Sequence, residues 1–510
     1  MMSESHPVFS LANGSAVPRS RIPRLPLDGF RGLVIGATKR GRRVAALFGT
    51  EAADGGMELI VVLAADADGV LDVASTPLTS TTFPSMTPEC PEVHLFEREI
   101  AEQWGIVPEG HPWLKPVRFS PPLRKRRNGT TPTGGATTTI GVMDFYRMEG
   151  EEAHEVAVGP VHAGVIEPGH FRFQCHGEQV FHLEISLGYQ HRGVERALVG
   201  GPDKRTIHYF ETLAGDTTVG HATAHCQAVE ALGRTRVPGR ALALRAIGLE
   251  LERLANHTGG LGALANDVGF LPTASFCGRL RGDYLNLSAA LCGSRFGRGL
   301  VRPGGVGFDA DAERLSDMSS RLDRAYRDTE QAVKLLWDSP SVMARFEETG
   351  RVDHGVARQL GLVGVAGRAC GLKRDVRKTH PSGYFRFTHI PISTWTSGDV
   401  FSRAYVRWLE IERSVDFLRA QLRQLPAGPA RVAPGPLRPD HLAVSLVEGW
   451  RGEICHVALT DQAGRFSAYK VVDPSFHNWS ALAMALRDQQ ISDFPLCNKS
   501  FDLSYCGFDL

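Results

Sequence analysis

The N-terminal part of the chain alternates between short apolar runs and polar turns. Three such runs, GLVIGA, VAALFG and MELIVVLAA, lie within residues 30–75 and are separated by Gly and Asp, as expected for strands joined by turns. Residues 92–105 (EVHLFEREIAEQWG) instead carry apolar positions at helical spacing. The pattern predicts a small α+β domain over residues 28–120.

Helical periodicity dominates the rest of the chain. Within residues 241–257 the apolar positions form a broad stripe, as on a helix that buries one face. Alternation in FRFQC and VFHLEISL predicts a hairpin around His176 and Gly177, and strand-like runs return near residue 443. We expect a large, mainly helical domain with peripheral β elements over residues 151–510, so the overall class is α+β. Its predicted helices cover residues 207–232, 237–258, 276–292, 309–337, 398–425 and 478–488.

Two segments lack the periodicity of packed elements. Residues 1–27 are rich in Ser, Pro and Arg, and we expect them to be mobile. Residues 121–150 begin with the basic and then Gly/Thr/Pro-rich run PPLRKRRNGTTPTGGATTT, which is typical of a solvated linker between domains. No aromatic residues interrupt this basic run, so we do not expect it to bind nucleic acid.

Composition and charge exclude several classes of protein. The chain has 57 Lys and Arg against 56 Asp and Glu, for a net charge of +1, so no overall field attracts nucleic acid or anionic lipid. No apolar run reaches the roughly eighteen residues of a membrane-spanning helix, and the N-terminal residues lack the order of a signal peptide. The nine cysteines are scattered without a C-x-x-C pair. This indicates reduced cytoplasmic thiols and no iron–sulfur cluster held by this chain alone.

A few polar residues within apolar segments are candidates for chemistry. His221 and His225 are four residues apart on a predicted helix, so they share one face and serve either packing or a metal. Asp267 is an acid in the apolar segment LGALANDVGFLP. A buried carboxylate is costly unless it is paired, so Asp267 is either a hydrogen-bonded anchor or a proton-handling group.

Several motifs resemble one family of redox proteins. Residues 97–106 (EREIAEQWGI) and 110–116 (GHPWLKP) resemble the small peripheral-arm subunit of respiratory complex I. Beyond residue 158, the chain resembles both the complex I subunit that walls the quinone cavity and the large subunit of formate-hydrogenlyase-type [NiFe] hydrogenases. The matching segments run in family order and are GPVHAGVIEPGHFRF, YQHRGVE, CQAVE, LELERLANH, VRPGGV, GRACGLKRDVRKTHP, SGDVFSRAYVRWLEIERS and VEGWRGE. Fusion of both subunits in one chain is typical of the formate-hydrogenlyase type.

The resemblance also identifies a departure from the hydrogenases. Their large subunits hold nickel and iron through two cysteine pairs, C-G-x-C-x-x-x-H and D-P-C-x-x-C. The matching segments here read AGDTTVGH and DLSYCG, which leaves Ala214, Thr217, Ser504 and Gly507 at the four thiolate positions. Methyl and hydroxyl groups do not replace soft thiolates, so we expect no metal bound by this chain.

The complex I quinone subunit also lacks these thiolates, so the resemblance makes it the nearest model for the function of this chain. In it, a Tyr at the cavity head and a His/Asp pair are thought to bind and protonate quinone. The Asp position falls on Asp267 and the His position near His162, whereas the Tyr position falls on Gly215. Glu167 resembles the proton-relaying Glu of the hydrogenase E-G-H segment, and His221 remains beside the emptied positions. The resemblance therefore implies catalytic roles for Asp267, His221, His162 and Glu167.

The implied function is that of a large subunit in a membrane-associated oxidoreductase complex. It would form a quinone-like cavity beside a [4Fe–4S] cluster in a partner small subunit and attach through membrane-arm subunits to the inner face of the cytoplasmic membrane. The sequence contains no dinucleotide-binding fingerprint, so no NAD site is expected in this chain. Two alternatives remain open: a redox-silent scaffold or coupling subunit of the same complex, and a hydrogenase with unusual ligands.

Overall fold

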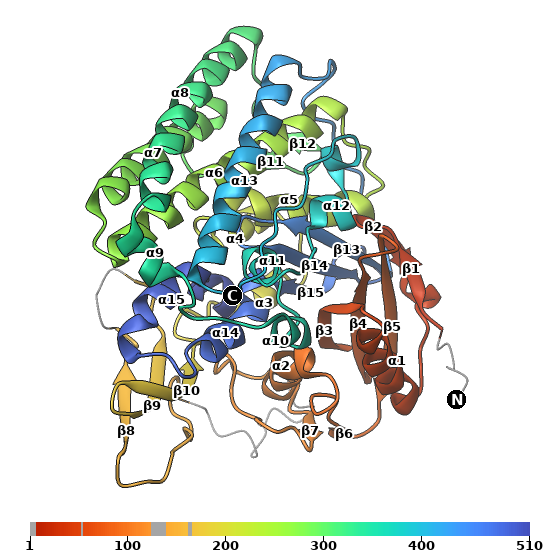
Figure 1. Cartoon of the computed structure of the whole chain (residues 1–510). Helices are drawn as coiled ribbons and strands as arrows, with labels where there is room; N and C mark the ends of the chain where they lie inside the picture. The colour runs from red at the N-terminus through yellow and green to blue at the C-terminus, as the bar shows by residue number, and fades with distance from the viewer. Residues whose placement is uncertain (1–6, 53–54, 124–138, 162–165) are drawn as a thin grey trace.

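The N-terminal unit is built on an antiparallel sheet with the strand order β1-β5-β4-β3. The structure, a computed structural model, describes residues 7–52, 55–123, 139–161 and 166–510 (Figure 1). The elements of this unit are β1 (Phe9–Leu11), β2 (Ser15–Pro18), η1 (Arg19–Arg21), α1 (Leu27–Lys39), β3 (Arg43–Glu51), β4 (Met57–Ala65), β5 (Val70–Leu78), β6 (Thr82–Pro84), η2 (Pro91–Val93), α2 (His94–Trp104) and β7 (Val107–Glu109).

One predicted strand of this unit is a helix. The run GLVIGA lies within α1, whose buried residues Phe30, Leu33, Val34 and Ala37 follow helical spacing. They cover the sheet, since α1 contacts β3, β4 and β5. A short apolar run does not distinguish a strand from a buried helix. Here the run forms a helix because its apolar face packs against the sheet. The helix predicted from EVHLFEREIAEQWG is confirmed as α2.

The larger unit contains a bundle in which α6, α7, α8 and α13 contact one another (Figure 1). The α+β class, with a sheet-rich unit followed by a largely helical one, is confirmed. The elements of this unit are β8 (Ala153–Val158), β9 (His170–His176), β10 (Gln179–Ser186), α3 (Val194–Leu198), α4 (Thr206–Thr212), α5 (Thr218–Leu232), α6 (Gly239–Asp267), α7 (Leu271–Cys292), β11 (Val301–Arg302), β12 (Gly305–Val306), α8 (Ala312–Trp337), α9 (Pro340–Phe346), α10 (His354–Gln359), α11 (Gly364–Ala369), α12 (Val376–Thr379), η3 (Gly383–Arg386), α13 (Val400–Arg423), β13 (His441–Glu448), β14 (Glu453–Thr460), β15 (Phe466–Val472), α14 (Pro474–Ala485), η4 (Ile491–Asp493), α15 (Phe494–Phe501) and α16 (Tyr505–Asp509).

Helix α6 is longer than its sequence pattern indicated. It continues to Asp267 through three glycines, Gly259, Gly260 and Gly262, at which the pattern weakens. A Cβ built on Gly259 would lie 2.7 Å from Arg281 Cδ, and one on Gly262 would lie 2.8 Å from Cys277 Cβ, both on α7. Gly259 and Gly262 therefore allow α6 and α7 to pack closely, and the tertiary contact outweighs the low helix propensity of glycine.

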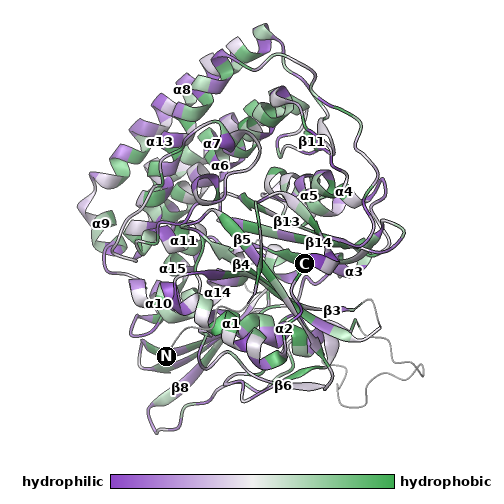
Figure 2. Cartoon of the chain, turned by 90° about the vertical axis from the view of Figure 1, so that its right-hand side faces the viewer, coloured by the Kyte–Doolittle hydropathy of each residue, from purple (hydrophilic) through white to green (hydrophobic). Residues whose placement is uncertain are grey.

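A second sheet, β15-β14-β13-β2, is antiparallel throughout. Every residue of β14 is buried, as is all of β13 after its first residue, and hydrophobic residues run along both strands, whereas α8 carries many hydrophilic ones (Figure 2). The position of this sheet in the interior differs from the expected peripheral β elements. Strand β2 pairs with β13, so this part of the segment expected to be mobile is held by a strand from the far end of the chain.

Buried ion pairs join the two units. Arg43 on β3 binds Glu453 on β14 with both guanidinium ends. Glu99 on α2 binds Arg118 and accepts two hydrogen bonds of 2.6 Å from Lys470 Nζ on β15. In the described ranges, none of the helices combines the length and apolar character needed to cross a membrane.

Removing the charge of Glu99 is expected to weaken this junction. Glu99→Gln leaves Arg118 and Lys470, each at most 3% exposed, without their shared carboxylate, and breaking such a buried pair costs about 3–5 kcal/mol of unfolding free energy. The control Glu89→Gln breaks an exposed pair with Lys39 at 3.7 Å and is expected to change that free energy by less than about 1 kcal/mol. Urea denaturation at pH 7 measures both, and equal effects would contradict the prediction.

Candidate functional site

The segments that carry the four expected thiolate positions meet in the interior. Ala214 and Thr217, both buried, lie in the turn between α4 and α5. Ser504 caps α16, where its Oγ accepts a hydrogen bond of 2.9 Å from the backbone N–H of Gly507. A Cβ built on Gly507 would lie 2.7 Å from Oδ2 of Asp473, and this same Oδ2 lies 3.1 Å from His221 Nε2 on α5. Asp473 and His221 therefore join the two segments.

The donor atoms at these positions do not fit a nickel–iron centre. The nearest thiol, Cys506, lies 3.4 Å from Ser504 Oγ, and burial together with the charge of Glu167 raises the pKa of this thiol to about 12. A single thiol does not supply the two pairs of soft thiolate ligands that a nickel–iron centre uses. Within the described part of the chain, no three His, Cys, Asp or Glu side chains are arranged to hold a metal ion.

An ion pair forms one wall of the site. Arg451 donates to both carboxylate oxygens of Asp216 at 2.6 and 2.8 Å, and its Nε donates to the backbone carbonyl of Asp502 at 2.6 Å. Burial alone would lower the pKa of Arg451, but Asp216 and the nearby Asp502 and Asp473 raise it above its ordinary value. The guanidinium therefore stays charged and fixes the turn that precedes α5.

The outer rim of the site contains two of the predicted residues. Glu167 is half-buried, and its Oε2 accepts a hydrogen bond of 3.2 Å from the backbone N–H of Tyr505, beside Ser504. A Cβ built on exposed Gly215 would meet no atom within 4 Å. The position at which the resemblance places a Tyr is therefore open space.

Asp267 lies at the C-terminal end of α6 and is exposed, not buried as its apolar segment suggested. The protein nevertheless desolvates its carboxyl group enough to raise its pKa to about 6; Asp502 adds to this rise and Lys499 opposes it. Lys499 binds Asp502 at 2.8 Å, and the backbone carbonyl of Asp502 accepts a hydrogen bond from Arg451 Nε. Asp267 interacts with Lys499 and Asp502 through their charges. His162 lies outside the described residues.

Comparisons with known proteins identify the family. Residues 267–436 match the model of the 49 Kd subunit of respiratory-chain NADH dehydrogenase, and residues 39–132 match that of its 30 Kd subunit. Hydrogenase-4 component G of Escherichia coli is 30% identical over 84% of this chain and 76% of its own length. Carbon monoxide-induced hydrogenase of Rhodospirillum rubrum is 31% identical over 68% of this chain and 97% of its own. The chain belongs to this family of NADH dehydrogenase and hydrogenase subunits.

Formate hydrogenlyase subunit 5 of Escherichia coli is 28% identical over 84% of this chain and 77% of its own length. The resemblance to fused complex I-type and formate-hydrogenlyase-type subunits is thus confirmed, and the chain is an oxidoreductase subunit of this family.

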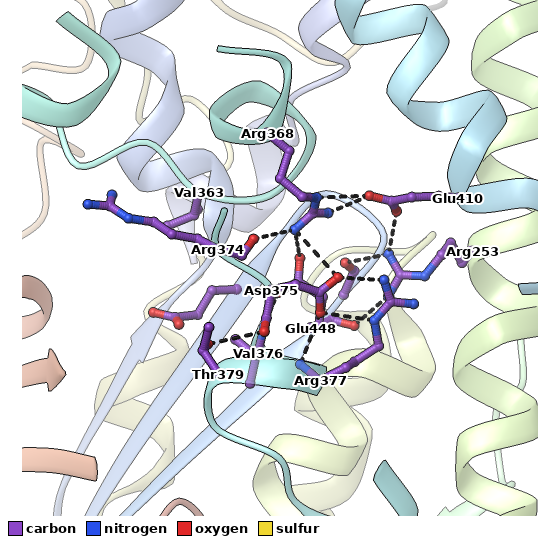
Figure 3. A network of polar contacts seen from close by, with 12 residues as sticks. Arg253, Val363, Arg368, Arg374, Asp375, Val376, Arg377, Thr379, Glu410 and Glu448 are labelled. Atoms are coloured by element: carbon purple, nitrogen blue, oxygen red, sulfur yellow. Dashed lines mark hydrogen bonds and ion pairs between the residues drawn. The ribbon is translucent and has the colours of Figure 1, made fainter. Parts of the chain in front are cut away.

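Behind the site, this family member contains a buried network of arginines and carboxylates (Figure 3). Arg368, which is 0% exposed, lies 2.6 Å from Glu410 and 2.7 Å from Glu448. Arg253 binds Glu410 at 3.0 Å and also donates to the backbone carbonyls of Glu448 and Gly449. These last bonds hold the start of the turn that carries Arg451.

The network contains one more carboxylate than arginines. Figure 3 shows Arg253, Arg368 and Arg377 among the acids, and burial raises the pKa of Glu448 above its ordinary value. In the same cluster, His257 Nε2 lies 2.8 Å from Oε2 of Glu410. The carboxylates paired with these arginines are Glu250, Asp375, Glu410 and Glu448.

Sequence reasoning missed three residues of the site: Asp216, Asp473 and His456. Asp473 Oδ1 caps α14 through the N–H of Ser475, and His456 Nε2 lies 3.1 Å from His221 Nδ1. Asp473 directly follows strand β15 and His456 lies within strand β14, whereas Asp216 lies in the turn between α4 and α5. The signal was available in EICHVALT, where a single His interrupts a buried strand.

Replacing Asp473 is expected to remove a pH-dependent part of the stability. Burial would raise the pKa of Asp473, but the hydrogen bond and charge of His221, with Arg451, lower it below its ordinary value. A lowered folded-state pKa stabilises the protein above about pH 4, and this contribution is lost as the pH falls through the folded pKa. Asp473→Asn should therefore cost about 2–3 kcal/mol at pH 7 and progressively less below pH 4.

Urea unfolding between pH 3 and 7 measures this difference. The matched control is Asp311→Asn, since Asp311 also caps a helix through its side chain, at 2.8 Å from the N–H of Arg314, but is exposed and has no His partner. If the loss of stability in Asp473→Asn did not change with pH, the lowered pKa of Asp473 in the folded state would be contradicted.

Proposed function

We propose that this chain is the large subunit of a membrane-associated oxidoreductase complex that transfers electrons to a quinone-type acceptor. A small partner subunit with a [4Fe–4S] cluster would supply the electrons. Attachment to membrane-arm subunits would hold the complex at the inner face of the cytoplasmic membrane. The observation that carries the proposal is that His221 and Asp473 lie beside Gly507, and Glu167 beside Tyr505, in the segments where the resemblance places metal-binding thiolates.

A quinone takes up two electrons and two protons when it becomes a quinol, so the site must supply protons. Asp267, with a pKa of about 6, is partly protonated near neutral pH, which suits a general acid. Glu167 lies at the rim, and His221 with Asp473 lies at the floor beside Gly507. His162 remains a proposed proton donor from the sequence resemblance.

Open space at Gly215 supports an acceptor with a ring. Where the resemblance places a phenol side chain, this chain has no side chain, and a Cβ there would meet nothing within 4 Å. In this proposal, a partner subunit covers the exposed side of the turn and encloses the acceptor against it. A quinone in this position would accept hydrogen bonds from acids on the rim in place of the missing phenol.

A specific observation favours the second candidate, a redox-silent scaffold. Arg451 and Asp216 satisfy each other within the emptied site, through hydrogen bonds of 2.6 and 2.8 Å. A self-contained ion pair of this kind suits a framework that needs no ligand. The two functions differ in whether the assembled complex reduces any quinone.

The purified complex is expected to contain no nickel at this subunit. With Ala214, Thr217, Ser504 and Gly507 at the thiolate positions, the available donors are too hard and too few. Elemental analysis of the complex, expressed as metal atoms per copy of this chain, should find no nickel. The iron content should equal that of the [4Fe–4S] cluster in the partner subunit. Stoichiometric nickel would establish the hydrogenase alternative and refute the proposal.

Asp267→Asn is expected to lower quinone reduction by the complex about tenfold or more, because a general acid contributes a factor of this size. Wild-type activity should fall as the pH rises through about 6, and the variant should lose this dependence. Asp317→Asn, at an exposed position of α8, serves as the control and should keep full activity.

Steady-state turnover with a short-chain quinone, on complexes of verified composition, tests this prediction. Equal activity of Asp267→Asn and wild type would exclude Asp267 as the proton donor. A complex whose cluster is reducible but which reduces no quinone would favour the scaffold.

A further inference from the structure

A continuous chain of hydrogen-bonded side chains crosses the interior from the site to the opposite side of α5. Asp473 Oδ2 lies 3.1 Å from His221 Nε2, and His221 Nδ1 lies 3.1 Å from His456 Nε2. His456 Nδ1 lies 3.0 Å from the hydroxyl of Tyr469, which in turn lies 3.1 Å from His225 Nδ1. The links join helix α5, strands β14 and β15, and the N-cap of α14.

All five groups are buried, with side chains at most 5% exposed. Polar rings are rare in such surroundings because each unpaired nitrogen or hydroxyl costs free energy. Here every link is satisfied by the next member of the chain. Phe210 stacks on His225 with ring centroids 4.1 Å apart and also contacts His456 and Tyr469, so it seals the chain on one side.

The far end of the chain reaches an open hollow of about 820 Å³. His225 lines this hollow together with Ile207, Val229 and the cationic residues Lys204 and Arg465. The other end, Asp473, lies next to Gly507 at an emptied metal position. A chain that served packing alone would not need to join a hollow on one side to the site on the other.

We propose that His225, Tyr469, His456 and His221 form a proton route from this hollow to Asp473. The route deepens the proposed function, on which its use for quinone protonation rests. A proton enters at His225 Nε2, and His225 passes its Nδ1 proton to the hydroxyl of Tyr469. Tyr469 passes its own proton to His456 Nδ1, His456 Nε2 donates to His221 Nδ1, and His221 Nε2 donates to Asp473.

Each group gains one proton and loses one, so no electrons move and no charge remains inside the route. Burial lowers the pKa of His225 to about 3, so it is neutral at rest and exchanges protons by tautomer change. Arg451 lies beside Asp473, and the thiols of Cys226 and Cys455 lie beside Tyr469. At the other end, Asp203, His208, Arg302 and Arg431 also line the hollow that His225 reaches. Burial raises the pKa of both thiols, so neither competes for the proton.

The first test is Tyr469→Phe in the full chain, because this change keeps the ring and removes only the hydroxyl shared by two links. NMR of protein with ¹⁵N-labelled histidine measures solvent exchange of the His221 ring N–H, which is assigned by its loss in His221→Gln. We expect exchange to slow by about tenfold or more, in line with the loss of a positioned proton-transfer group. Tyr284→Phe is the control, since Tyr284 is buried and bonded to Thr329 at 3.0 Å, away from the route.

A second test uses the assembled complex. Tyr469→Phe should lower quinone turnover without changing the apparent KM, and His225→Ala should be rescued by imidazole added to the solution, which enters through the hollow. Unchanged His221 exchange in Tyr469→Phe, with backbone amide exchange of α5 also unchanged, would overturn the route. Slower exchange with unchanged turnover would support the route and count against its use in the proposed function.

Discussion

The buried arginine–carboxylate network is the constraint on which the rest of the larger unit depends. Arg368 and Arg253 connect α6, α11, α13 and the end of β13 in a region without water-exposed side chains. Removing one partner of such a cluster leaves an uncompensated charge, which costs far more than the net contribution of an intact pair. The elements therefore have one compatible arrangement, and the turn that carries Arg451 is fixed with them.

This rigidity explains how the segments around Asp473 and His221 keep their positions. In a metal protein the ion itself holds its ligand segments together. Here Asp473 and His221 perform that task, and Arg451 with Asp216 braces the turn before α5. Each of these contacts joins a hydrogen-bond donor to an acceptor, which is the arrangement that the proposed proton chemistry needs.

The sequence predicted the element types well where the pattern was long. The helices near 237–258, 309–337 and 398–425 correspond to α6, α8 and α13, and the hairpin around His176 and Gly177 is formed by β9 and β10. The single helix expected over 207–232 is two, α4 and α5, separated by the turn of the emptied site. Helical periodicity continues across such a turn, so periodicity alone did not reveal the break.

By itself, the sequence determined the α+β class, the order of the two units and the family. These are local properties of residue type, spacing and motif order. Tertiary structure alone decided that Asp267 is exposed, that α1 is a helix, and that Asp473 and His456 belong to the site. The reason is that burial and hydrogen-bond partners depend on segments more than two hundred residues apart, whose meeting no local pattern records.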